Sequence, residues 1–137
     1  MSAPTSLAFL VVAGGRGVRA GAGGPKQYRP VLGKSLLSHT LEALHAAAPS
    51  ALLQTVIHAD DGPAYDACVA ELSEVARRHL AEPAEGGASR QESVRNGLEA
   101  LASLETPPKI VLIHDAARPF ADAALIERAI DAAREFG

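Results

Sequence analysis

Three short apolar runs of strand length restrict the possible folds of this chain more than any other feature. They span residues 7–12 (LAFLVV), 52–59 (LLQTVIHA) and 109–114 (KIVLIH). Because none of them shows a strict alternation of apolar and polar residues, each indicates a strand that is buried on both faces. Stretches with helical periodicity separate the runs. This alternation predicts an α/β fold with a mostly parallel sheet between two layers of helices.

Helix signals fill the intervals between the first runs. Ser35 is a predicted N-cap for a helix over 36–47, which ends before Pro49. The expected apolar face of that helix comprises Leu36, Leu37, Thr40, Leu41 and Leu44. A second helix is expected over 64–79, with Tyr65, Cys68, Leu72 and Val75 at helical spacing.

The second half of the chain continues the pattern. Ser89 is followed three residues later by Glu92, which is the capping-box spacing that begins a helix. Pro107 and Pro108 end that helix before the third apolar run, and a last helix is expected over 123–136. No repeat or linker divides the 137 residues, so we expect a single nucleotide-binding domain portion over 1–137.

Composition and charge exclude several classes of protein. The net charge of −3 argues against a general affinity for nucleic acid. A single cysteine, Cys68, excludes an internal disulfide and a zinc site of several thiolates, and it is expected to be a small core residue. No apolar run approaches the roughly 18 residues of a membrane span. The first run has no Lys or Arg ahead of it to form a signal peptide. These features predict a cytoplasmic protein.

A glycine-rich loop directly follows the first apolar run. Six of the twelve glycines fall between Gly14 and Gly24, and the cations Arg16, Arg19 and Lys26 accompany them. Glycines at the end of a strand let backbone N–H groups approach a phosphate without obstruction by Cβ atoms. In parallel sheets, ligands bind beyond the carboxyl ends of the strands, where this loop is expected to lie.

Several interpretations of the loop compete. A dinucleotide fingerprint at 15–20 is weakened by the glycines and proline that follow it, because they would break the required helix. A P-loop ending at 33–35 would need glycine where Tyr28 stands. The third interpretation is an extended loop that wraps a triphosphate and carries its own cations, and the fourth is a plain surface loop.

Three motifs together resemble one enzyme family. The pattern A-G-G-x-G-x-R at 13–19, followed by P-K-Q at 25–27, resembles the signature of sugar- and polyol-phosphate nucleotidyltransferases. The strings GGASRQESV at 86–94 and HDAARP at 114–119 narrow the resemblance to 2-C-methyl-D-erythritol 4-phosphate cytidylyltransferases of the non-mevalonate isoprenoid pathway. The resemblance implies a three-layer, Rossmann-like nucleotidyltransferase fold. The nearest sister family is that of ribitol-5-phosphate cytidylyltransferases.

The resemblance also implies a reaction and a set of catalytic residues. The phosphate of the acceptor would attack the α-phosphorus of CTP in line, and pyrophosphate would leave. Arg19 and Lys26 would neutralise the charge at the α-phosphate. Asp115 would bind Mg²⁺, although it could instead only cap the following turn. Arg16 and Arg118 are expected to face solvent and to brace a loop, respectively.

Nucleotide recognition is implied for a second set of residues. The cytosine and the phosphates would lie near Ala13, Gly14, Gly15, Gly87 and Ser93. Backbone groups would do most of the recognition, with help from the Ser93 hydroxyl. Ser93 could also be an ordinary helix residue, and Arg90 either orients the Gly86–Gly87 turn or is a solvated residue of the first helical turn.

Chains of this family are longer and work as homodimers, and their acceptor-binding residues come later than residue 137. The resemblance therefore implies a shortened sheet that holds the nucleotide-binding half, without transferase activity of its own. A nucleotide-binding module that never catalysed a reaction is the alternative from another functional class. The acceptor, methylerythritol phosphate or ribitol phosphate, is not determined by these residues.

Overall fold

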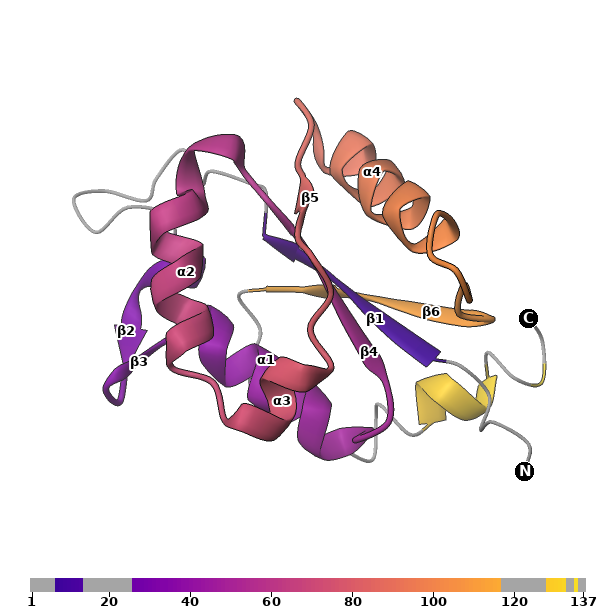
Figure 1. Cartoon of the computed structure of the whole chain (residues 1–137), viewed down its shortest axis with the longest axis horizontal. Coiled ribbons are helices and arrows are strands. Elements are labelled where there is room, and N and C mark those ends of the chain that lie inside the picture. The colour runs from indigo at the N-terminus through magenta and orange to yellow at the C-terminus, as the bar shows by residue number, and fades with distance from the viewer. Residues whose placement is uncertain (1–6, 14–25, 117–127, 133–134, 136–137) are drawn as a thin grey trace.

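The computed structural model describes residues 7–13, 26–116, 128–132 and 135 (Figure 1). Four strands form the main sheet in the order β5-β4-β1-β6. They are β1 (Leu7–Ala13), β4 (Leu52–Ile57), β5 (Ala84–Glu85) and β6 (Ile110–Asp115). All of their pairings are parallel. The predicted α/β class and parallel sheet are confirmed.

Strand β1 is the centre of the sheet, and every residue in it is buried. Its odd-numbered side chains, such as Phe9 and Val11, belong to the same core cluster as Leu37, Leu41 and Leu44 of α1 (Leu36–Ala47). Leu10 faces the other way and meets α4 (Arg90–Ala102). Helices thus cover both faces of the sheet, as Figure 1 shows, and the predicted three layers are confirmed.

The close packing of α4 on the sheet depends on a glycine. A Cβ atom at Gly97 would overlap Leu10 and would lie 2.7 Å from Cγ2 of Val56. The absence of a side chain at Gly97 therefore lets α4 approach β1 and β4 closely enough to bury Leu101.

The predicted helix over 36–47 is confirmed as α1, with Ser35 as its N-cap. The Ser35 hydroxyl accepts a hydrogen bond from the Ser38 amide at 3.1 Å. Before α1 stands a short antiparallel hairpin of β2 (Pro30–Val31) and β3 (Lys34–Ser35). Its two turn residues, Leu32 and Gly33, both have positive φ angles, which suit a tight two-residue hairpin turn.

The single helix expected over 64–79 is wrong, because two helices occupy this region. Helix α2 (Gly62–Ala70) ends, and α3 (Glu74–Arg78) begins at a new N-cap, Ser73, whose hydroxyl accepts from the Ala76 amide. Val75 is 52% exposed and does not belong to the apolar face. The strand before α2 also ends at Ile57, since His58 caps the 3₁₀ turn η3 (Ala59–Asp61).

Burial explains the state of two side chains on α2. Desolvation raises the pKa of Tyr65 to about 12, so the phenol stays neutral and accepts a hydrogen bond from Thr55 at 2.8 Å. Burial also raises the pKa of the Cys68 thiol, which agrees with the prediction of a small core residue.

The last two elements differ in how far the structure describes them. The third apolar run forms β6, but its residues are only half-buried or exposed, because β6 lies at the border of the described sheet. Within the expected last helix, residues 128–132 are helical and Ile130 joins the core. Among the described residues, no helix has the length and apolar character needed to cross a membrane.

A half-buried carboxylate joins the start of α1 to the end of α2. Oε1 of Glu71 accepts hydrogen bonds from the Ser38 hydroxyl at 2.6 Å and from the Ser35 amide at 3.0 Å. These donors, the Ser38 hydroxyl first, hold the pKa of Glu71 below its usual value. The bonds favour the ionised form of the Glu71 carboxyl group. They also connect two helices on one face of the sheet.

We predict that Glu71 contributes to the acid sensitivity of the fold. A carboxyl group whose pKa is lower in the folded state stabilises the fold above its unfolded pKa, and this contribution is lost as the pH falls through the folded pKa. Glu71→Gln should therefore flatten the decline of the free energy of unfolding in the acidic range, measured by urea denaturation. Glu105→Gln, which removes an exposed carboxylate from a loop, should leave the decline unchanged.

Candidate nucleotide site at the carboxyl edge of the sheet

The carboxyl ends of all four parallel strands lie along one edge of the sheet. Ala13 pairs with Ile57, and Ile57 with Glu85, while Asp115 pairs with Val12 on the other side. The backbone amide of Gly86 then donates to Ile57 O at 2.7 Å. This edge carries Ala13 and Lys26, which border the glycine-rich loop, together with the Gly86–Gly87 turn and Asp115.

Lys26 is held beside the end of β1 by its neighbour in the chain. It begins the 3₁₀ turn η2 (Lys26–Tyr28), and its own side chain is exposed. The next side chain, Gln27, is buried, and its Nε2 donates a hydrogen bond to Ala13 O at 2.9 Å. This bond fixes the turn to the last residue of β1. The backbone of Lys26, which belongs to the same turn, is therefore held at the edge of the sheet.

The anchoring role of Gln27 was missed by sequence reasoning. The residue was noticed only as part of the P-K-Q string, with no role of its own. The available signal is weak, because an amide next to a lysine in a loop is usually solvated. Only the fold shows that this amide lies over the end of a buried strand.

The glycine pair and the start of α4 form a turn with a dense set of hydrogen bonds. The Gly87 amide donates to the Ser93 hydroxyl at 3.0 Å, and the Ala88 amide donates to Glu92 Oε1 at 2.9 Å. The capping prediction is confirmed for Ser89, which accepts from the Glu92 amide at 3.1 Å. A Cβ atom at Gly87 would overlap the Glu92 side chain, so this position requires glycine.

Ser93 is therefore more than an ordinary helix residue. Its side chain is 2% exposed, and its oxygen sets the conformation of the Gly87 amide. Asn96, one turn further along α4, donates to Glu85 O at 3.0 Å and holds the helix to the end of β5. A direct role of the Ser93 hydroxyl in reading a base stays a prediction. Arg90 is exposed at the first position of α4, and its role in orienting the turn also stays a prediction.

Asp115 ends β6 with an exposed side chain. The following residue, Ala116, is buried and donates its amide to Val12 O at 3.1 Å. Mg²⁺ commonly takes one or two carboxylates together with phosphate oxygens and water, so an exposed aspartate at a strand end fits this ion. No group of three or more candidate ligands (His, Cys, Asp or Glu) occurs among the described residues, so a cage built only of protein side chains is not found there.

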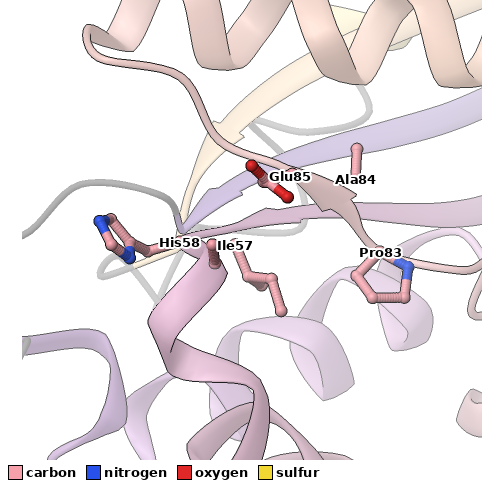
Figure 2. A pocket seen from close by; sticks show the side chains of 6 residues that line it. Ile57, His58, Pro83, Ala84 and Glu85 are labelled. Carbon is pink, nitrogen blue, oxygen red and sulfur yellow. The ribbon is translucent and has the colours of Figure 1, made fainter.

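A cavity of about 200 Å³ opens at the ends of β4 and β5. Its walls are formed by Ile57, His58, Ala59, Pro83, Ala84 and Glu85. Figure 2 shows that His58 and Glu85 come from the ends of the two neighbouring strands. Nδ1 of the His58 ring already takes part in a hydrogen bond, which it accepts from the Asp60 amide at 3.0 Å. This cavity was not anticipated from the sequence.

Some predicted residues lie outside the part of the chain that the structure describes. They are Gly14, Gly15, Arg16, Arg19 and Arg118. Their roles stay predictions. Ala13, Lys26, Gly87, Ser93 and Asp115 are described, and the strand ends bring their segments to one edge.

Solved structures of other proteins share this fold. A crystal structure of 4-diphosphocytidyl-2C-methyl-D-erythritol synthase is similar with a TM-score of 0.75 and 26% identity, covering 98% of this chain and 57% of that chain. The bifunctional IspDF from Campylobacter jejuni has a TM-score of 0.68 at 20% identity, covering 92% of this chain and 30% of its own. The chain thus shares the fold of these proteins.

The family assignment is more specific than the fold. The model of the IspD family, 2-C-methyl-D-erythritol 4-phosphate cytidylyltransferase, matches residues 7–136, and the chain belongs to this family. The bifunctional enzyme IspD/IspF of Rhodopseudomonas palustris (strain BisB18) is 50% identical over all 137 residues. The chain spans about a third (32%) of the length of that relative.

We predict that the Gln27–Ala13 bond stabilises the edge of the sheet. Gln27→Leu keeps a similar volume but leaves the Ala13 carbonyl without its donor, which should lower the free energy of unfolding by about 1–3 kcal/mol. Chemical denaturation measures this change. Gln91→Leu, on the exposed surface of α4, should change stability little; an equal loss in both variants would mean that the bond contributes nothing.

Proposed function

We propose that this chain provides the CTP-binding part of an enzyme that transfers CMP from CTP to 2-C-methyl-D-erythritol 4-phosphate. One observation carries the proposal: in a member of the IspD family, Lys26, the Gly87–Ser93 turn and Asp115 stand at the same carboxyl edge of a parallel sheet. Ligands of open α/β sheets bind at this edge.

The proposed reaction requires above all that the negative charge on the transferring phosphoryl group be neutralised. A phosphate oxygen of the acceptor forms a bond to the α-phosphorus of CTP, the bond to the bridging oxygen breaks, and pyrophosphate leaves with the electron pair. Negative charge on the transferring group increases during this step, and cations aimed at it lower the barrier. We assign this role to Lys26 and Arg19, since Lys26 is exposed at the edge.

Asp115 would hold Mg²⁺, which supplies charge neutralisation to the phosphate oxygens when it is bound. The exposed carboxylate at the end of β6 supports this assignment. The nucleotide itself would be recognised by Ala13, Gly14, Gly15, Gly87 and Ser93. The Gly87 conformation that the Ser93 hydroxyl holds would then present the backbone of this turn to the base.

The proposal also covers the cellular location, the oligomeric state and the acceptor of the enzyme. We infer a cytoplasmic protein that works as a homodimer, as the family resemblance implies. Methylerythritol phosphate is favoured over ribitol phosphate as acceptor because the matched family model is that of the methylerythritol phosphate enzymes.

The proposed function predicts a preference among nucleotides. The chain should bind CTP more tightly than ATP, each in the presence of Mg²⁺, because the turn at Gly87 and Ser93 is assigned to a pyrimidine. Isothermal titration calorimetry of the chain with both nucleotides measures the difference. Equal or tighter binding of ATP would contradict the cytidylyl assignment.

The proposed function also predicts the effect of replacing Lys26. Residues 7–136 can replace the matching segment of the Rhodopseudomonas palustris relative, which gives a chimera of full length. In that chimera Lys26→Ala should lower turnover about 10²–10³-fold, as expected for loss of one donor to the transition state. Binding of CTP should change less.

The matched control is Lys109→Ala. Lys109 precedes β6 and therefore lies at the opposite, amino edge of the sheet. Its replacement should leave pyrophosphate release from CTP and methylerythritol phosphate nearly unchanged. Unchanged turnover of Lys26→Ala in the active chimera would make Lys26 an ordinary loop residue.

A further inference from the structure

A buried hydroxyl on α1 contacts the turn that follows Asp115. Thr40 is fully buried, and its Oγ1 lies 2.7 Å from the carbonyl oxygen of Ala116, which is 76 residues away in the sequence. The same oxygen lies 3.1 Å from Leu36 O, the acceptor that a threonine in a helix commonly uses. One hydroxyl has one proton, and the shorter contact is the one to Ala116.

Ala116 is consequently held on both sides. Its amide donates to Val12 O on β1, and its carbonyl accepts from Thr40 on α1. Asp115 stands immediately before it, in register with Val12 at the end of β6. The backbone next to the aspartate is therefore fixed between the central strand β1 and helix α1.

We infer that Thr40 is a positioning residue, which orients Asp115 for Mg²⁺ by holding the Asp115–Ala116 turn. This inference rests on the proposed function, in which Asp115 binds the ion. Thr40 has no exposed surface with which to contact a substrate, so it acts only through the turn. Partners in the shell around a ligand commonly orient it, and their loss typically lowers metal affinity or activity about 10–100-fold.

The inference depends on the hydroxyl rather than on the volume of the side chain. Thr40→Val keeps the branched shape and removes the donor. Ala116 is 1% exposed, so water has little access to its carbonyl, and an unsatisfied buried acceptor is costly. The turn should then relax toward a conformation in which the carbonyl finds another donor, and Asp115 should move with it.

The test uses two NMR measurements on the ¹⁵N-labelled chain. Without ligand, Thr40→Val should increase hydrogen exchange of the Ala116 amide about tenfold. In titrations with CTP, the variant should require about tenfold more Mg²⁺ to reach the bound spectrum, while binding of CTP without Mg²⁺ should be unchanged. Thr40→Ser, which restores the hydroxyl, should restore both values.

Thr55→Val is the matched control. Thr55 is also fully buried and donates to the Tyr65 hydroxyl at 2.8 Å, on β4 and away from the turn. Its loss should reduce global stability without changing the Mg²⁺ requirement. An equal Mg²⁺ effect in Thr55→Val, or faster exchange at Ala116 with an unchanged Mg²⁺ requirement in Thr40→Val, would overturn the inference.

The outcomes separate the inference from the proposed function. A wild-type chain that shows no binding of CTP with Mg²⁺ would overturn the proposed function, and the role of Thr40 toward Mg²⁺ would fall with it. A wild-type chain that binds CTP with Mg²⁺, beside a Thr40→Val variant that binds identically, would overturn the inference alone.

Discussion

The parallel pairing of β1 with β4 on one side and β6 on the other is the interaction on which the rest of the structure depends. A parallel arrangement brings the carboxyl ends of strands to one edge, whereas an antiparallel one would separate them. The backbone of β1 is also the acceptor for the contacts that fix the site, since Ala13 O accepts from Gln27 and Val12 O accepts from the Ala116 amide. The geometry of the candidate site and the geometry of the sheet are thus set by the same strand.

Local signals in the sequence predicted the elements that depend on local chemistry. The buried strand at 7–12, the helix over 36–47 with its Ser35 cap and the cap at Ser89 all follow from apolar runs and from side chains that satisfy backbone amides nearby. The same reasoning joined α2 and α3 into one helix, because the apolar spacing continues across the break. Ser73, which caps α3, was not recognised as a competing start signal.

The contacts that complete the candidate site could not be predicted in this way. Gln27 and Thr40 meet acceptors far away in sequence, and only the assembled sheet brings these partners together. Thr40 was expected on the apolar face of its helix. Its burial confirms that prediction, but the prediction gave no partner for its hydroxyl. The family resemblance named Lys26 and Asp115, which are exposed, but not the buried residues that position them.

The pairing of Leu7 with Ile110 also has a consequence for biosynthesis. Strand β1 is synthesised about 100 residues before β6, which is its partner on one side. At synthesis rates of about 5–20 residues per second, the side of β1 that pairs with β6 remains unpaired for several seconds. Contacts of such long sequence separation slow folding, because a large loop must close before they form. The turn carrying Asp115 can therefore dock on β1 only after β6 has been synthesised, and a nascent chain held before that point would expose an apolar strand to chaperones.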